Sequence, residues 1–502
     1  MASGPGPRGP EPENETTTKP GHLPGFCREG DRRFLLIAAI LASALGFIDG
    51  TIIAIALPAI RAGLGASLGQ ALWINNAYLL PLSALILLGG ALGDRFGVAR
   101  AFGSGIAVFM AASLLCAVAP TAETMIAGRV LKGIGAALMI PGSLSLIART
   151  YPRADRGRAI GVWAAASALT TALGPILGGL ALGLGGPETW RLLFAINLPL
   201  GAVALWLLRR NVRHDPKGPP TPLDWPGAAL ITACLFSLAY GLTGPQGVTD
   251  PRPFSAAALF LAWFVWREAR TAYPMVPLGL FSDRAFAAAN LATFLVYFAL
   301  TTVLFYLPMT LIAGWGTSEA LASAVFAPLS VFIATLSATS GRLADRYGPG
   351  RLIGAGGALV ALAFAGLALG IGTRNLWTGV LPATALMGLG MALVVAPLST
   401  AIMTSLPEDR SGTASGINNA VSRVAGLIAV ASMGSLAAAL YSAAGGSGSF
   451  GAIADDPAHA TAMTQAFAGL AWTTAALSAA GAAIGWLLIP SPPQSREISA
   501  RR

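Results

Sequence analysis

The sequence predicts an all-α membrane protein whose spans are organised in two related halves. Three observations lead to this fold class. Of the 502 residues, 55% are hydrophobic and only 11% are charged, whereas soluble proteins carry about 25% charged residues. The apolar residues come in runs long enough to cross about 30 Å of hydrocarbon as helices. Finally, one sequence motif that follows an apolar run in the first half of the chain recurs in the second half.

The repeated segment covers Gly90–Arg100 and Gly341–Arg351. Six of its eleven positions are identical in the two copies. Each copy joins two apolar runs through an Asp-Arg pair, with a glycine two residues further on. Two unrelated turns could share glycine and charge, but the shared order of residues favours an internal repeat.

The apolar runs predict fourteen spans in three groups. Residues 1–33 are expected to form a disordered cytoplasmic tail. The N-terminal bundle, 34–208, holds spans near 34–57, 72–92, 101–119, 124–147, 158–182 and 191–208. The linker, 209–284, begins with a basic, Pro-rich stretch and holds two inserted spans near 225–243 and 254–268. The C-terminal bundle, 285–490, holds spans near 285–311, 318–341, 351–371, 377–402, 413–440 and 464–489, and residues 491–502 are a second cytoplasmic tail.

The basic residues predict the orientation of the chain. With a cytoplasmic N-terminus, the inner loops and both tails hold 25 of the 32 Lys and Arg residues, and only Arg61, Arg191, Arg252 and Arg374 face outside. This asymmetry satisfies the positive-inside rule. Because Lys is rare while Ala, Gly and Arg are abundant, the coding sequence is expected to be GC-rich. We therefore expect a multi-pass protein of a bacterial cytoplasmic (inner) membrane.

Composition also excludes several classes of protein. The net charge is +10, but the basic residues are scattered in short loops, so we expect no nucleic-acid partner. Three cysteines without paired spacing argue against disulfides and metal sites. The three histidines lie outside the spans, and no ATP-binding P-loop motif occurs. We expect a non-enzymatic protein that uses no cofactor other than a proton gradient.

The segment Gly90–Arg100 resembles the signature loop of the major facilitator superfamily, which lies between the second and third helices of each half. Further matches, described below, extend the resemblance over about 34–490. It implies two six-helix bundles, here with two inserted helices, and a conformational latch at the cytoplasmic end. The resemblance assigns to this latch Gly90, Asp94, Arg95, Gly97, Arg100, Asp345 and Arg346.

Asp49 is the carboxylate that lies deep in a predicted span. A charge inside a membrane is costly, so it should face the bundle interior and have a partner. The stretch Phe47–Pro58 resembles the motif Asp-x-Thr-Ile-Val-x-x-Ala-Leu-Pro of fourteen-span drug:proton antiporters. The resemblance implies a role for Asp49 in proton coupling.

The predicted partners of Asp49 are Arg129 and Lys132 in the fourth span. They are three residues apart, so they share a helical face. Counted from the outer ends of their helices, Asp49 is about 13 Å deep and Lys132 about 12 Å deep. The segment resembles the family's Arg-x-x-Gln-Gly motif, except that Lys132 occupies the position of Gln. The alternative is a purely structural ion pair that locks two helices.

The fifth span contains Gly174, Pro175, Gly178 and Gly179. Small residues allow close helix packing, and proline bends a helix. The stretch resembles the antiporter motif Gly-x-x-x-Gly-Pro-x-x-Gly-Gly, although Thr170 replaces its first glycine. The resemblance favours export over import.

Aromatic and polar residues in or near the spans are candidates for the substrate cavity, because apolar pockets with few polar groups suit amphipathic molecules. The alternative for Trp and Tyr is an anchoring role at the membrane interface. Arg423 is expected either to close the cytoplasmic gate or to extend toward the surface. The candidates are Trp73, Asn76, Trp163, Asn290, Tyr297, Asn419 and Arg423.

Together, these features predict a monomeric, proton-coupled exporter of small amphipathic organic compounds, a multidrug efflux antiporter that works by alternating access. Two alternatives remain open. One is a dedicated exporter of a single endogenous metabolite or lipid, and the other is a facilitator that is not coupled to an ion.

Overall fold

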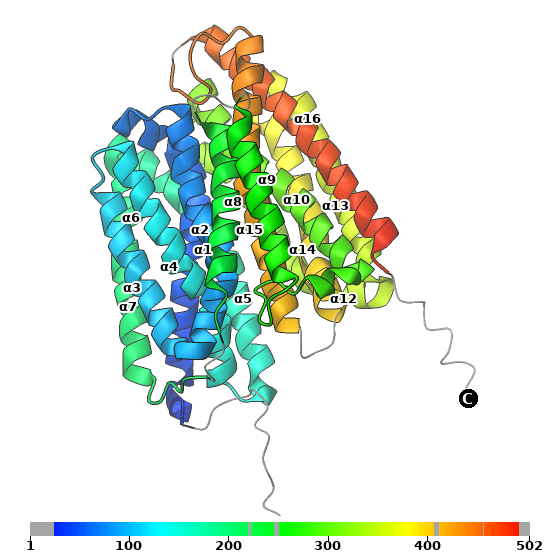
Figure 1. The fold of residues 1–502 in the computed structure, drawn as a ribbon. Helices are drawn as coiled ribbons and strands as arrows, with labels where there is room; N and C mark the ends of the chain where they lie inside the picture. The colour runs from blue at the N-terminus through cyan, green and yellow to red at the C-terminus, as the bar shows by residue number, and fades with distance from the viewer. Residues whose placement is uncertain (1–24, 219–221, 245–249, 406–410, 455, 491–502) are drawn as a thin grey trace, which may run out of the picture.

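A computed structural model describes residues 25–218, 222–244, 250–405, 411–454 and 456–490. Its regular elements in these ranges are helices (Figure 1), which confirms the predicted all-α class. Three predicted segments fall partly or wholly outside the described residues. They are most of the N-terminal tail (1–24), part of the basic linker (219–221) and the C-terminal tail (491–502).

The N-terminal half contains α1 (Arg32–Leu64), α2 (Leu68–Phe96), α3 (Val98–Ala117), α4 (Ala122–Thr150), α5 (Arg153–Gly185), α6 (Trp190–Ala195) and α7 (Asn197–Asn211). The sequence predicts α6 and α7 as one span, but the helix is interrupted at Ile196. Pro199 explains the break, because it lies four residues after Ala195 and has no N–H to donate to the Ala195 carbonyl.

The C-terminal half contains α10 (Arg284–Met309), α11 (Glu319–Ala324), α12 (Ala327–Tyr347), α13 (Pro349–Gly370), α14 (Leu381–Thr404), α15 (Ser411–Ala443) and α16 (Pro457–Leu488). Here α11 and α12 are also one predicted span that is broken. Pro328 stands four residues after Ala324, the last residue of α11, so the same missing donor accounts for this break. Hydropathy does not reveal either break, because both pieces of each span are apolar.

The two halves share an equivalent helix crossing. A Cβ atom on Gly105 of α3 would lie 2.8 Å from the carbonyl oxygen of Gly135 on α4. A Cβ atom on Gly356 of α13 would lie 2.7 Å from the carbonyl oxygen of Gly390 on α14. Only glycine permits backbones to approach this closely. This shared crossing supports the internal repeat that the two copies of the loop predict.

The halves meet along α2 and α15, and again where α5 approaches α11 and α12. We call the end of the molecule that holds the α1–α2 turn and the α15–α16 loop the outer end. There, Arg61 of α1 donates to the carbonyl of Phe450 at 2.8 Å and to the hydroxyl of Ser449 at 3.3 Å. Arg61 is only 7% exposed. Arg61 is therefore buried at the outer end, where it bridges the two halves.

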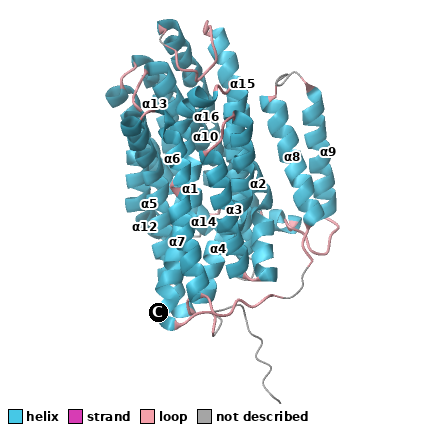
Figure 2. Cartoon of the chain, turned by 90° about the vertical axis from the view of Figure 1, so that its left-hand side faces the viewer, coloured by secondary structure: helices cyan, strands magenta, loops and turns pink. Residues whose placement is uncertain are grey.

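Helices α8 (Trp225–Thr243) and α9 (Pro251–Glu268) form the inserted pair. The pair stands at one side of the molecule (Figure 2), where α8 packs on both α2 and α15. It therefore covers the seam between the halves. Among the described residues, twelve helical segments are long and apolar enough to cross a bilayer. Helices α5 and α9 are not among these twelve, so the total of fourteen spans stays a prediction.

Two buried carboxyl groups join the ends of this inserted pair. Asp224 caps α8 by accepting from the N–H of Gly227 at 3.0 Å, and it accepts from Arg267 of α9 at 2.9 Å. Glu268, which is 3% exposed, accepts from the N–H of Val276 at 2.6 Å. The second oxygens of Asp224 and Glu268 are buried without a hydrogen-bond donor. Burial and the adjacent Asp224 raise the pKa of Glu268 to about 7, so the pair shares a proton near neutral pH.

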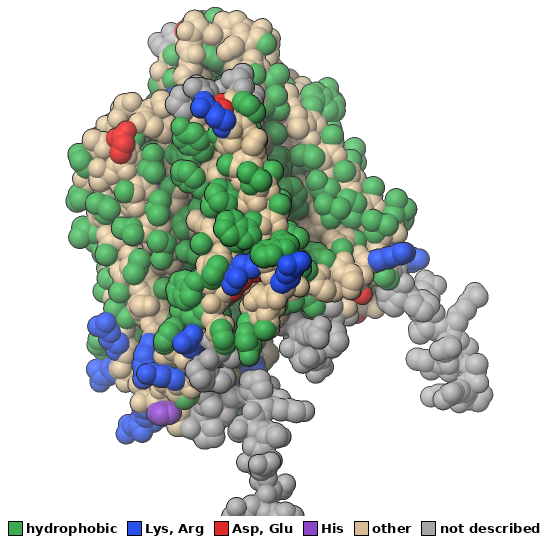
Figure 3. Space-filling view, viewed as in Figure 1, with side chains coloured by type: hydrophobic (Ala, Val, Ile, Leu, Met, Phe, Trp, Pro, Cys, Tyr) green, Lys and Arg blue, Asp and Glu red, His purple; other side chains and the backbone are tan. Residues whose placement is uncertain are grey.

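Charge is distributed unevenly over the molecule. In the face shown in Figure 3, hydrophobic side chains cover the middle, and most Lys and Arg side chains gather at the end opposite the outer end. The exposed residues Arg209 and Arg210, which end α7, belong to this basic end. An apolar belt with a basic rim is the surface of a multi-pass membrane protein.

Candidate functional site

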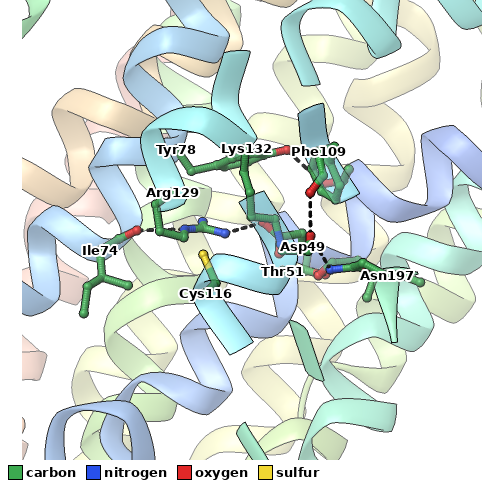
Figure 4. Close-up of polar contacts among 12 residues, drawn as sticks. Asp49, Thr51, Ile74, Tyr78, Phe109, Cys116, Arg129, Lys132 and Asn197 are labelled. Carbon is green, nitrogen blue, oxygen red and sulfur yellow. Dashed lines mark hydrogen bonds and ion pairs between the residues drawn. The ribbon is translucent and has the colours of Figure 1, made fainter. Parts of the chain in front are cut away.

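Three charged side chains meet inside the N-terminal half (Figure 4). Asp49 comes from the middle of α1, and Arg129 and Lys132 come from α4. Lys132 donates to Oδ1 of Asp49, and Arg129 donates to Oδ2. The side chain of Asp49 is 1% exposed, and those of its two partners are fully inaccessible. The structure thus brings together the three residues that the sequence predicts as a set, which we call the charge triad.

Helix α2 holds Arg129 from the other side. The Nε of Arg129 donates to the carbonyl oxygen of Ile74 at 2.9 Å, and its guanidinium lies 4.5 Å from the ring centre of Tyr78. The Tyr78 hydroxyl donates in turn to the carbonyl of Gly46 on α1 at 3.2 Å. The Nη2 of Arg129 is buried and has no partner among the described residues. Arg129 therefore connects α1, α2 and α4 and keeps one donor unused.

Two aromatic rings surround Lys132. Its ammonium lies 4.6 Å from the ring centre of Phe109 on α3 and 4.8 Å from that of Phe194 on α6. A cation over an aromatic face is stabilised by the ring quadrupole, most strongly when water is excluded. The sequence does not reveal these partners, because Phe109 and Phe194 lie in apolar runs where any aromatic residue fits the pattern.

The charge triad binds a proton only if its ion pairs change. Two cations and one carboxylate leave a net positive charge at a site inaccessible to bulk solvent, and each carboxylate oxygen of Asp49 is bound by one of the cations. Protonating Asp49 in this arrangement would leave both cations without a counter-ion, which is strongly unfavourable. Proton binding therefore requires α1 and α4 to rearrange, or Lys132 to release its own proton. The triad can thus link a proton to a change of helix packing.

The glycine motif of α5 packs against the helix that carries Asp49. A Cβ atom on Gly174 would lie 2.5 Å from Oγ1 of Thr51, and one on Gly178 would lie 2.4 Å from Cγ1 of Ile52. A Cβ atom on Gly179 would lie 2.4 Å from the carbonyl oxygen of Glu319, which begins α11 in the other half. The motif therefore lets α5 touch both α1 and the C-terminal half at the outer end.

The first copy of the latch is organised by a tight turn. Gly97 has a φ of 108°, which side chains rarely adopt. The carboxylate of Asp215 accepts from the N–H of Arg100 at 2.9 Å, so the linker caps α3. The Asp94 carboxylate is 73% exposed and lies 3.4 Å from Arg149 at the end of α4. The carboxylate of Asp94 therefore pairs within the N-terminal half, and its backbone carbonyl accepts from the N–H of Gly218 in the linker at 3.0 Å.

The second copy of the latch repeats the turn. Gly348 has a φ of 87° and corresponds to Gly97 in the repeat. The guanidinium of Arg346 lies 5.3 Å from the ring centre of Tyr347. The role of both copies as a latch stays a prediction.

The candidate cavity residues fall into different places. Trp73 lies against Phe236 of α8, with ring centres 5.5 Å apart, so it faces the inserted pair. Asn290 is buried and accepts from Asn418 at 3.3 Å, which links α10 to α15. The indole of Trp163 donates to Ser43 at 2.9 Å, which links α5 to α1. These three side chains already have contacts that account for their positions.

The remaining candidates differ in how far they are buried. Asn76 is fully buried, and its Nδ2 lacks an acceptor among the described residues. Tyr297 and Asn419 are half-buried, on α10 and α15. The guanidinium of Arg423 on α15 lies 5.9 Å from the ring centre of Phe47 on α1, in the other half. Arg423 is therefore positioned between the halves.

Two helical bundles that meet along a seam, with charges buried inside one of them, are the architecture of a polytopic membrane transporter. The sequence profile of the Major Facilitator Superfamily matches residues 39–430. The chain therefore belongs to the Major Facilitator Superfamily.

Relatives and solved structures agree with this assignment. The chain is 31% identical over 430 residues to the tetracenomycin C resistance and export protein of Streptomyces glaucescens, covering 83% of this chain and 78% of the relative. It is 30% identical over 471 residues to a methylenomycin A resistance protein of Streptomyces coelicolor, covering 92% and 94%. A bacterial homologue of the human lysosomal transporter Spinster shares the fold with a TM-score of 0.66 at 20% identity, covering 92% of this chain and 98% of that one.

Proposed function

We propose that this transporter exports amphipathic organic compounds, antibiotics among them, in exchange for protons. The relatives of the chain include resistance and export proteins, which supports export of antibiotic-like compounds. The observation that carries the proton coupling is the charge triad, in which the deep carboxylate Asp49 has both oxygens bound by Arg129 and Lys132.

The proposed cycle uses the two states that the triad can adopt. With the outer end closed, Asp49 is ionised and its ion pairs hold α1 against α4. When the halves open outward, a proton from outside neutralises Asp49, weakens both ion pairs and favours release of the substrate outward. When the halves reopen inward, the proton leaves to the cytoplasm and the ion pairs form again. The protein needs no cofactor in this scheme, because the inward proton gradient drives export.

The proposal includes the placement of the protein. Both termini are cytoplasmic, the basic end faces the cytoplasm of a bacterium, and the protein acts as a monomer in the cytoplasmic membrane. The positive-inside rule supports this orientation.

A proton-release assay on the purified protein tests the proposal. In weakly buffered detergent solution with a pH indicator, substrates from a panel of antibiotic-like compounds should release protons from the wild-type protein. Asp49→Asn should abolish this release and uphill export from proteoliposomes, while substrate binding persists because the neutral amide resembles the protonated acid. Glu29→Gln is the matched control, since Glu29 is an exposed carboxylate paired with Arg32 at 2.8 Å.

The outcome that contradicts the proposal is equally specific. If Asp49→Asn exports uphill at the wild-type rate, Asp49 does not carry the proton. If dissipating the proton gradient leaves export by the wild-type protein unchanged, the protein is an uncoupled facilitator.

A further inference from the structure

Arg423 is a cation in the interior of the transporter that has no anionic partner among the described residues. It lies four residues from the middle of α15, roughly 6 Å along the helix axis. The ion pairs of the described residues do not include it, and its Nε is buried without a hydrogen-bond acceptor. Arg423 is half-buried, and a charged residue without a counter-ion inside a membrane span usually serves function.

The surroundings of Arg423 come from both halves. Its guanidinium lies 5.9 Å from the ring centre of Phe47 on α1. A molecule bound beside Arg423 would therefore touch helices that separate when the halves move. Aromatic rings next to a cation suit the apolar body of an amphipathic molecule with a charged group.

The interior charges are predominantly positive. Away from the ends of the described spans, the charged side chains are one carboxylate, Asp49, and three cations, Arg129, Lys132 and Arg423. The charge of Asp49 is compensated by two of these cations, and its side chain is 1% exposed, so it is not accessible to a cationic substrate. A lipophilic cation would thus meet net repulsion, whereas an organic anion would provide the counter-ion that Arg423 lacks.

We propose that Arg423 binds the anionic group of the substrate, so that the transporter prefers amphipathic organic acids over lipophilic cations. This inference rests on the proposed export function and specifies its substrate class. The acid would enter from the cytoplasm, pair with Arg423 and place its apolar body against the ring of Phe47. Export of an anion against an inward-moving proton transfers positive charge into the cell, so a negative-inside membrane potential would favour it.

Two probes with the same pyrenyl-alkyl body and opposite charges test the preference for acids over cations. They are 4-(1-pyrenyl)butyrate and 4-(1-pyrenyl)butylamine, and binding to the purified full-length protein is followed by the pyrene fluorescence. The wild-type protein should bind the acid at least about tenfold more tightly than the amine. This comparison needs no variant, so it remains decisive even if a substitution at position 423 impairs folding.

Variants then assign the preference to Arg423. Arg423→Gln should lose the preference for the acid, and Arg423→Glu should reverse it toward the amine. Arg284→Gln is the matched control, because it removes an exposed cation from the first turn of α10, and it should leave both affinities unchanged. The inference is refuted if the wild-type protein binds the two probes equally, binds neither, or keeps its preference for the acid in Arg423→Gln.

Proteoliposomes separate failure of this inference from failure of the proposed function. If the wild-type protein exchanges protons for the amine but not for the acid, export stands and the charge preference is refuted. If the acid binds through Arg423 but is neither exported nor able to release protons, the binding site stands and the proposed function is refuted.

Discussion

The ammonium of Lys132 donates a hydrogen bond to Oδ1 of Asp49, while Arg129 donates to Oδ2. The position of Lys132 is usually Gln in the family motif that the segment resembles. A neutral amide there would leave Asp49 with one full ion pair, whereas this chain supplies two. In the proposed mechanism, proton binding competes with two cations, so we predict that Lys132 lowers the pH at which the proton is taken up.

Substituting Lys132 should change the pH dependence of transport. In Lys132→Gln, only one cation opposes protonation of Asp49, so the proton binds at lower proton concentration. We expect the midpoint of the transport pH profile to move upward by about one unit or more, with coupling retained. Uptake into proteoliposomes at a constant pH difference and varied absolute pH measures this midpoint.

An apolar variant serves as the control for that experiment. Lys132→Met removes the charge but preserves most of the side-chain volume against Phe109 and Phe194, so it should give the same shift. An unchanged midpoint in both variants would show that Lys132 serves helix packing or substrate contact instead of tuning the proton site.

Asp94→Asn should slow transport without weakening substrate binding. Asp94 is 73% exposed and lies 3.4 Å from Arg149, far along α2 from the charge triad. An exposed pair of this kind contributes about 0.2–1 kcal/mol, so turnover should fall by a few-fold at most through this pair alone. Separate measurement of substrate affinity in detergent and turnover in proteoliposomes checks the prediction.

The equivalent substitution in the other half, Asp345→Asn, should have a milder effect. Loss of substrate binding in Asp94→Asn, with turnover per bound substrate unchanged, would contradict the role of the loop as a latch.

The contact of Asp224 and Glu268, at the ends of α8 and α9, should become less stable as pH rises. The folded protein raises the pKa of Glu268 from 4.5 to about 7, so the folded state binds this proton more tightly than the unfolded state. The resulting stabilisation is fully present below about pH 4.5 and is lost as pH rises through about 7. Glu268→Gln imitates the protonated acid and should raise the free energy of unfolding at pH 8 but not at pH 4, by an amount on the order of 1 kcal/mol, so the thermal unfolding midpoint should rise only at pH 8.

Thermal unfolding in detergent at both pH values measures the effect. The exposed carboxylate variant Glu29→Gln provides the reference and should show no such difference between the two pH values. If Glu268→Gln raised the unfolding midpoint above that of the wild-type protein equally at pH 4 and pH 8, the amide would stabilise the site by packing alone.

Thiol labelling should establish the orientation. Cys27 is half-buried near the start of α1, so a membrane-impermeant thiol reagent should reach it only after the cells are opened. A cysteine introduced at Ser447, in the loop between α15 and α16, should react in intact cells, or in spheroplasts where an outer membrane is present. Cys116 and Cys234 are buried and act as internal controls. Labelling in the reverse order would invert the orientation.

Sequence pattern predicted the helices well but not their interruptions. The inserted span predicted near 225–243 coincides with α8, because apolar length alone defines such a helix. By contrast, α1 extends to Leu64, beyond the predicted end near residue 57. Its last turn is stabilised by the packing of Arg61 against the other half. The breaks before α7 and α12 depend on single prolines, which a hydropathy average does not resolve.

The charge triad shows what the sequence by itself determined. A carboxylate in an apolar run requires a partner, and the spacing of Arg129 and Lys132 places both on one face of α4 at the depth of Asp49. The partners of Asp49 were therefore predictable, because the cost of burying a charge and the periodicity of a helix are local properties of the chain.

Only the tertiary structure decided which charges remain without a partner. Arg61 and Arg423 are both isolated arginines in the sequence, yet Arg61 is bound by a loop 388 residues away, whereas Arg423 lies between the halves without an acceptor. The physical reason is that hydrogen-bond partners for an arginine come from whichever helices and loops pack around it. That packing depends on contacts between segments far apart in the chain, and no local pattern encodes it.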